Sequence, residues 1–128
     1  MGDTWIVVLL QIVVAASVLA ASPVHTVLTA PGHSPAVNTR WHYSVHVTKA
    51  GKPVAAKLTV QIVDPIGGAH PVTYGSTTKP IKNWPFTGVF RDYIIWPKST
   101  RGIPLKLRLT VRADRTTKVL TYAVTSHA

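Results

Sequence analysis

The feature that most constrains this chain is a two-residue alternation of apolar and polar side chains that recurs after residue 38. Apolar residues occupy every second position of the stretch "WHYSVHV" at 41–47, and residues 58–62 repeat the pattern. Successive side chains of a β-strand point to opposite faces, so the alternation predicts strands that are buried on one face. No segment after Ala21 has the i, i+3, i+4 apolar spacing of an amphipathic helix, which excludes a helical domain.

The clearest pair of strands is the last one, "PLKLRLTVRADRTTKVLTYAV" at 104–124. If Arg112 pairs with Thr117 across a short loop, the apolar residues of the two strands lie opposite one another. The pairs predicted by this register are Leu109 with Leu120, Leu107 with Tyr122 and Leu105 with Val124. One shared apolar face indicates a hairpin that packs against a core.

Turn signals divide the rest of the chain into short strands. The sequence "KAGKP" at 49–53 predicts a tight turn, so we expect strand 58–62 to pair with strand 41–47. Residues 64–85 are rich in turn-forming residues, and residues 88–96 form the next extended run. Six or seven short strands, with a turn signal every ~8–12 residues, predict an antiparallel β-sandwich, with a barrel as the alternative.

Two stretches of the sequence resemble a known group of domains. The pieces "GKPVAAKLTVQIVDP" and "GIPLKLRLTVRADRTTKVLTYAVT" are similar to the early and final hairpins of bacterial exported Ig-like and fibronectin type III-like domains. The resemblance covers residues 39–128 and concerns members without a disulfide, since the chain has no cysteine. It implies an all-β, antiparallel Ig-like β-sandwich of about seven strands. It also implies an adhesion, scaffold or accessory role outside the cytoplasm, and no catalytic residues.

An uncharged apolar segment, "WIVVLLQIVVAASVLAA" at 5–21, precedes this domain. Its length suits the hydrophobic region of an export signal or a minimal membrane anchor, which needs ~17–20 residues. Small residues near its end favour cleavage before Ala21 over cleavage after Ser22. The positively charged residues that usually precede the apolar region of an export signal are missing, and Asp3 is present instead. An uncleaved anchor and a true chain start further upstream therefore remain alternatives. A buried core helix is disfavoured because the segment has no polar face.

We therefore predict a signal peptide or membrane anchor at residues 1–22, and a domain that is secreted or membrane-anchored outside the cytoplasm. Residues 23–38 contain three prolines, a glycine and small polar residues. This composition predicts a linker, with at most one edge strand at 24–28. Residues 39–128 then form the sandwich domain.

The charged residues argue against an enzyme. The chain has 14 Lys and Arg, four Asp and no Glu, for a net charge of +10. Acid–base catalysis commonly needs paired carboxylates in one cleft, whereas Asp64, Asp92 and Asp114 each lie near a turn or beside a cation. A set of Ser44, His42 and Asp92 lacks any nucleophile elbow. The absence of cysteine excludes thiolate nucleophiles and thiolate metal sites. We expect no catalytic residues and no cofactor.

Six histidines raise the question of a metal site. His42 and His46 share a strand face, but positions i and i+4 lie ~13 Å apart at ~3.3 Å per residue, too far for one ion to bind both. Met1 is the single methionine, whereas copper carriers also use methionine. An amino-terminal copper site at residues 23–25 would need the disfavoured cleavage after Ser22. A copper carrier is therefore disfavoured, and we predict no metal ligands.

The cations of the last hairpin form the first candidate site. Lys106, Arg108 and Arg112 occupy alternate positions opposite uncharged residues, so no acid neutralises the row in its own hairpin. Such a row attracts polyanions, and the partners we expect are anionic lipid, wall polymer or an acidic protein. Nucleic acid is not expected, because the face lacks interleaved aromatic residues. The alternative is that the cations only keep an edge hairpin soluble and block edge-to-edge pairing.

Aromatic residues of the middle third form the second candidate site. Trp84, Phe86 and Trp96 could dock a protein partner or, alternatively, fill the core. The sequence as a whole predicts an exported, non-enzymatic binding or scaffold module whose basic face associates with anionic envelope components. It would also associate with the membrane through residues 1–22 if these are not cleaved. An accessory subunit that docks through the aromatic residues is the alternative function.

Overall fold

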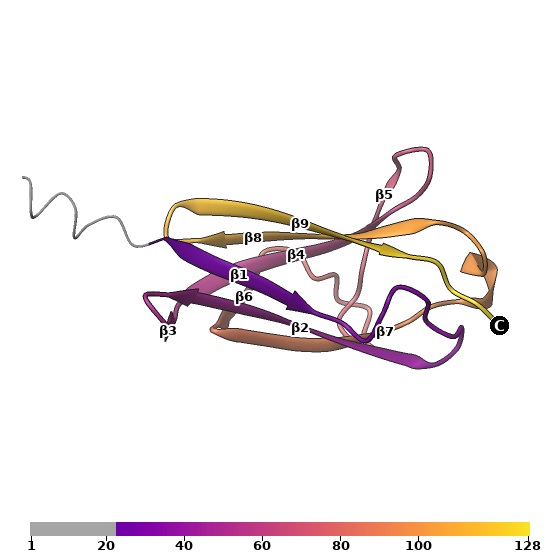
Figure 1. Ribbon diagram of the computed structural model, residues 1–128, viewed down its shortest axis with the longest axis horizontal. Helices are drawn as coiled ribbons and strands as arrows, with labels where there is room; N and C mark the ends of the chain where they lie inside the picture. The colour runs from indigo at the N-terminus through magenta and orange to yellow at the C-terminus, as the bar shows by residue number, and fades with distance from the viewer. Residues whose placement is uncertain (1–22) are drawn as a thin grey trace, which may run out of the picture.

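The computed structural model describes residues 23–128, and the predicted signal or anchor at 1–22 lies outside these residues. Two antiparallel sheets pack face to face (Figure 1). The first sheet contains β1 (Val24–Thr29), β2 (Arg40–Lys49), β3 (Lys52–Pro53) and β7 (Val89–Ile95). The second contains β4 (Ala55–Val63), β5 (Ala69–Pro71), β6 (Trp84–Thr87), β8 (Leu105–Ala113) and β9 (Thr116–Val124). The prediction of an all-β antiparallel fold is confirmed.

A single turn of 3₁₀ helix, η1 (Lys98–Thr100), links β7 to β8. No helix within residues 23–128 is long and apolar enough to cross a membrane. The strand pairs and the buried core of the described residues form one sandwich.

The β8–β9 hairpin has the predicted register. Arg112 pairs with Thr117, and the three apolar pairs follow as expected from Leu109–Leu120 to Leu105–Val124. The loop contains two residues, Asp114 and Arg115, both with positive φ, as a type I′ hairpin turn requires. Alternate residues of β8 are fully or almost fully buried, so the hairpin covers the second side of the core.

The predicted pairing of strand 58–62 with strand 41–47 is wrong. β2 pairs with β1, β3 and β7, whereas β4 crosses to the second sheet and pairs with β8. The turn at 49–53 does form, but it supports only two residue pairs, Lys49 with Lys52 and Thr48 with Pro53. Pro53 has no N–H group to continue the ladder. The apolar faces of β2 and β4 therefore face each other across the sandwich instead of lying side by side.

The predicted linker at 23–38 is part of the folded domain. β1 pairs with β2 along six residues, from Val24 opposite Lys49 to Thr29 opposite Ser44. The following loop runs beside the end of the chain, where the Thr125 amide donates to the His33 carbonyl oxygen at 2.9 Å. The many prolines of this segment indicated a linker, but prolines are compatible with loops that hydrogen-bond through their other residues. The edge strand that the sequence allowed at 24–28 is therefore present as β1, and it belongs to the first sheet.

The core lies between the two sheets and is built from the apolar faces that the alternation predicts. Its fully buried large side chains are Trp96, Leu58, Ile81, Leu107, Leu109, Val45, Val47, Val60, Val111 and Val124. An aromatic cluster closes one end, where Trp41 packs edge-on against Trp96 with ring centroids 5.6 Å apart. Both sheets turn their other faces to solvent, and the outer face of the second sheet carries a group of cations on β4 and β8.

Candidate anion-binding surface

The outer face of the second sheet carries the predicted row of cations. Lys106 and Arg112 are exposed on β8 and Arg108 is half-buried between them. β8 lies between β4 and β9, so the row occupies a central strand and not the edge of the sheet. Protection of an edge strand therefore does not explain it. We call the outward residues of β4, β8 and β9 the basic face.

The neighbouring strand adds a fourth cation. Lys57 is exposed on β4 and lies directly opposite Arg112 in the register of the two strands. Two cations in opposed positions repel each other and destabilise a sheet. The sequence did not predict this residue as part of the site because β4 was expected to pair with another strand.

Arg108 has a defined orientation on this face. Its Nε and Nη2 both donate to Oε1 of Gln61, at 3.2 and 2.7 Å, and Gln61 is its register partner on β4. The amide is neutral, so the pair fixes the guanidinium without cancelling its charge. A preoriented cation loses less side-chain entropy when it binds an anion than a mobile one does.

The three carboxylates of the described residues are all engaged away from the basic face. Asp64, at the end of β4, accepts hydrogen bonds from His70 Nε2 and from the Gly68 amide, both at 2.8 Å, and these bonds lower its pKa. Asp114 bonds to Lys49 of the first sheet, and this contact lowers the pKa of Asp114. Asp92 is buried on the inner side of β7. Among residues 23–128, no acid occupies an outward position of β4, β8 or β9.

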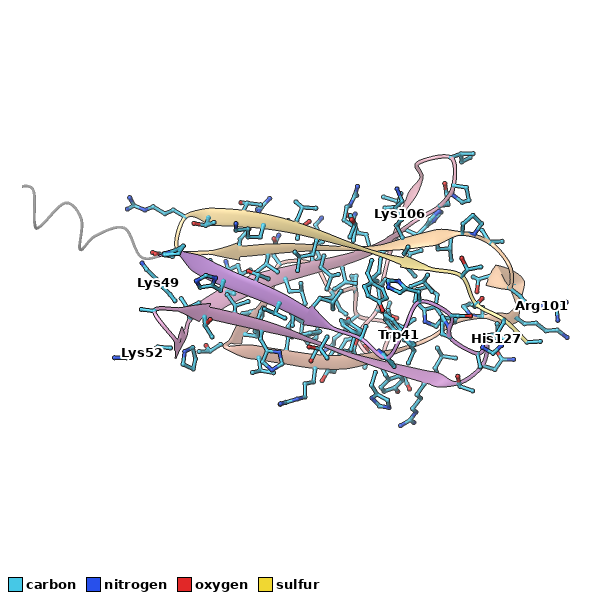
Figure 2. The ribbon with its side chains drawn as sticks, in the orientation of Figure 1. Trp41, Lys49, Lys52, Arg101, Lys106 and His127 are labelled. Carbon is cyan, nitrogen blue, oxygen red and sulfur yellow. The ribbon has the colours of Figure 1, made fainter. Side chains whose placement is uncertain are left out.

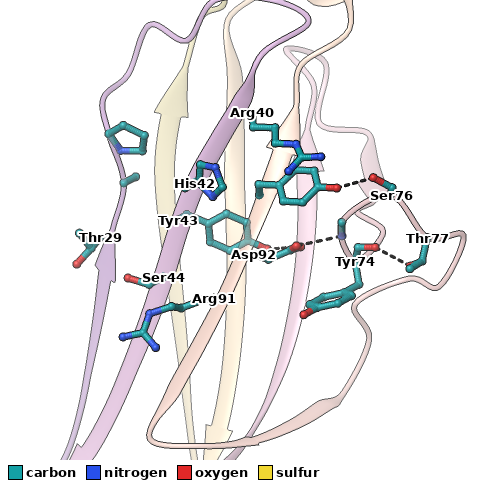
Figure 3. A pocket seen from close by; sticks show the side chains of 14 residues that line it. Thr29, Arg40, His42, Tyr43, Ser44, Tyr74, Ser76, Thr77, Arg91 and Asp92 are labelled. Carbon is teal, nitrogen blue, oxygen red and sulfur yellow. Dashed lines mark hydrogen bonds between the residues drawn. The ribbon is translucent and has the colours of Figure 1, made fainter.

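The outer side of the first sheet has a hollow of about 860 Å³ (Figure 3). Arg40 and Arg91 lie on its floor, and the Arg40 guanidinium is 4.6 Å from the ring centroid of Tyr93. One wall is the loop at 74–77, where Ser76 Oγ hydrogen-bonds Tyr93 Oη. Two arginines and several hydroxyl groups therefore lie in a hollow whose lining is otherwise mostly apolar.

Asp92 holds the wall of that hollow in place. Its carboxylate accepts a hydrogen bond from the Gly75 amide at 3.0 Å and one from the Tyr43 hydroxyl at 3.5 Å. Burial raises the pKa of Asp92, and burial also raises the pKa of Tyr43. His42, Ser44 and Asp92 all line the hollow, but His42 and Ser44 lie on the outer side of β2 and Asp92 on the inner side of β7. The Asp92 carboxylate accepts its hydrogen bonds from Gly75 and Tyr43 and not from His42.

The histidines of β2 also stay apart from other ligands. His42 lies against the Tyr93 ring at a centroid distance of 5.8 Å, and His46 lies further along the strand. Within residues 23–128, no three histidine, aspartate or glutamate side chains come close enough to hold a metal ion together.

The three aromatic residues predicted to dock a partner do not form a common surface. Trp84 is half-buried and stacks on Tyr74 at 4.8 Å, and Phe86 is half-buried against Phe90 at 5.9 Å. Trp96 is completely buried with 0% exposure, so its assignment to a docking surface was wrong. Trp96 is an even number of residues from the buried Phe90, so in an extended segment both side chains point to the same face. This spacing in the sequence indicated that Trp96 is buried.

The fold and the basic face together define an all-β sandwich with an unneutralised cationic surface. No family model matches the chain, and no curated protein sequence matches it. Among solved structures, the chain is similar to a DUF4466 family protein from Parabacteroides merdae ATCC 43184, with 16% sequence identity and a TM-score of 0.44. The match covers 81% of this chain and 44% of that protein, so this chain spans less than half of its length.

Proposed function

We propose that this protein is a non-enzymatic binding module of Ig-like architecture that acts outside the cytoplasm. Its basic face binds anionic components of the cell envelope. The observation that carries the proposal is the row of Lys106, Arg108 and Arg112 on a central strand, extended by Lys57 on β4 without any acid on the same face. Neither protection of an edge nor neutralisation by neighbours accounts for this arrangement, whereas an external anion does.

The electrostatics support a broad, salt-sensitive contact. The net charge of +10 attracts polyanions over the Debye length, about 8–10 Å at physiological salt. Each Lys or Arg near an anionic membrane contributes about 1 kcal/mol to binding. The docking function that involved Trp96 receives no such support, because that side chain is buried.

The test is a co-sedimentation assay of the full chain with phosphatidylcholine vesicles and with the same vesicles containing phosphatidylglycerol. Plain phosphatidylcholine measures any binding through the apolar segment at 5–21. We expect the additional binding to phosphatidylglycerol to disappear between about 0.05 M and about 0.5 M salt, since screening shortens the Debye length. Anionic binding that does not change with salt would refute the proposal.

Variants locate the contact. Lys106→Glu with Arg108→Glu should weaken anionic binding by at least about tenfold, since two contributions of about 1 kcal/mol are lost and two repulsive charges are added. Lys98→Glu with Arg101→Glu changes the net charge equally at η1, and both residues are exposed there. This control should retain most of the binding. Equal losses in both variants would show that only the total charge matters, which would contradict a specific basic face.

A further inference from the structure

A groove of about 790 Å³ lies at one end of the basic face, between β6 and the β8–β9 turn. Its lining includes Ala55, a small side chain on the same face as Lys57, which leaves space beside the cations. Three cations and three hydroxyl groups also line it, namely Lys57, Arg112 and Arg115 with Thr87, Thr116 and Thr117. The volume is that of a small-ligand site.

The cations of the groove repel one another when it is empty. Lys57 and Arg112 are register partners, so their Cβ atoms lie within about 5.5 Å on the same side of the sheet. Asp114 is the nearest acid in the sequence. Its carboxylate is bound to Lys49 and also attracts the neighbouring Arg115, but it does not line the groove beside Lys57 and Arg112. No acidic residue is among the groove-lining residues. A bound anion would remove this repulsion.

The third cation is held in a conformation that costs energy. Arg115 has φ of 62° and follows Asp114 with φ of 47°, in a two-residue loop where glycine is preferred at the second position. The left-handed region is unfavourable for a side chain with a Cβ. Strained residues cluster at binding sites, where the surrounding contacts maintain them. Arg115 carries such strain and lines the groove, and glycine in its place would remove the strain.

We infer that this groove binds a phosphate group, as a phosphate monoester or phosphodiester. Arginine forks donate two parallel hydrogen bonds to phosphate oxygens, lysine supplies a point charge, and threonine hydroxyls donate further bonds. Pro85 is the register partner of Lys57 and adds an exposed apolar side chain beside the cations. A phosphodiester with its organic substituents fits such a mixed lining better than a bare ion does. This inference deepens the proposed function, because it names the ligand chemistry and the place on the basic face.

The groove lies at the end of the sandwich where β1 begins. β1 begins at Val24, which pairs with Lys49, and Lys49 in turn contacts Asp114 of the turn beside the groove. In Figures 1 and 2 the start of β1, the β8–β9 turn, Lys49 and Lys52 all lie at the same end of the sandwich, and Arg101 lies at the other. The described part of the chain thus begins at the end of the sandwich that carries the groove (Figure 1). A phospholipid headgroup and a soluble phosphodiester both supply the required chemistry.

The experiment measures binding of inorganic phosphate, glycerophosphoglycerol and phosphatidylglycerol vesicles to the full chain, by calorimetry and by the shift of the thermal midpoint. We expect glycerophosphoglycerol to bind more tightly than inorganic phosphate and to raise the midpoint. Lys57→Gln and Arg112→Gln should each weaken binding by about tenfold, because each removes a charged hydrogen bond. Lys106→Gln should leave binding of the soluble ligands within about twofold while it weakens vesicle binding.

Arg115→Gly separates a binding role from a structural one. It should raise the thermal midpoint by about 4 °C without ligand, since the turn loses its strain, and still lower the affinity for glycerophosphoglycerol by about tenfold. Arg101→Ala removes one charge at the far end and should change neither value. Vesicle binding without binding of the soluble headgroup would refute the groove and leave the proposed function intact. Unchanged affinity in Arg115→Gly and Lys57→Gln would refute the groove as well.

Discussion

Trp96 provides the sharpest test of the core, since its side chain has 0% exposure and packs edge-on against Trp41. It lies just after β7, at the end of the sandwich that the aromatic cluster closes. Its indole Nε1 is also buried and has no hydrogen-bond partner among the described residues. Two substitutions separate these properties. Trp96→Ala removes both the ring and the N–H group, whereas Trp96→Phe keeps a ring and removes the N–H group.

The two variants should differ strongly in the free energy of unfolding. A buried tryptophan replaced by alanine leaves a cavity and costs about 3–5 kcal/mol. This cost is a large part of the total stability of a domain of this size, about 5–15 kcal/mol. In Trp96→Phe, the smaller ring loses packing, but the loss of an unpaired buried donor recovers about 1–3 kcal/mol. We therefore expect the phenylalanine variant to stay within about 1.5 kcal/mol of the natural protein.

Urea unfolding of the full chain, followed by far-UV circular dichroism, measures both values. With a slope of about 1–3 kcal/mol per molar urea, the alanine variant should lose at least about 1 M in its midpoint. Unchanged slopes would show that the compactness of both end states is preserved. An alanine variant within about 1 kcal/mol of the natural protein would refute the buried position of Trp96. Equal losses in both variants would refute the cost assigned to the unpaired Nε1.

Two further predictions concern particular residues. Burial raises the pKa of Asp92 above its ordinary 3.8, so the folded state binds more protons than the unfolded state, and this residue's contribution to stability falls as pH rises through that window. Asp92→Asn should abolish this fall in the free energy of unfolding, measured by urea titration at several acidic pH values. The same pH dependence of the unfolding free energy in both proteins would contradict the prediction. Ala50 has φ of 51° in the β2–β3 turn before Gly51, so Ala50→Asn, which creates the preferred Asn-Gly turn, should add about 1 kcal/mol of stability. A lower thermal midpoint would exclude this turn geometry.

The β8–β9 hairpin could be predicted in detail because its information is local. Its two strands are joined by two residues, and only one register places Leu107 opposite Tyr122 and keeps the apolar face continuous. The sheet partners of β2 and β4 could not be predicted in the same way. Alternation of apolar and polar residues shows which face of a strand is buried. The same alternation is expected whether the next strand pairs with the first in one sheet or packs against it from the opposite sheet.

The candidate site shows the same division between local and distant information. Lys106, Arg108 and Arg112 follow from alternation within one strand, whereas Lys57 joins them only through the pairing of β4 with β8. Arg115 also has a local signal in the sequence. The register itself leaves only two residues in the loop, and such loops require positive φ, so an arginine there was already unusual.

The aspartates of this domain hold loops and turns in place. This structural role determines how substitutions of charged residues affect stability and anion binding. Asp64 organises the loop after β4, Asp92 attaches the loop at 74–77 to the first sheet, and Asp114 links the last hairpin to Lys49. Each carboxylate therefore has fixed partners, whereas Lys106 has no hydrogen-bond partner among the described residues. Substitution of an acid should change stability and its pH dependence with little effect on anion binding. Substitution of an outward cation should do the reverse, since removing one of several repelling charges costs the fold little. This separation makes the binding proposals testable in folded proteins.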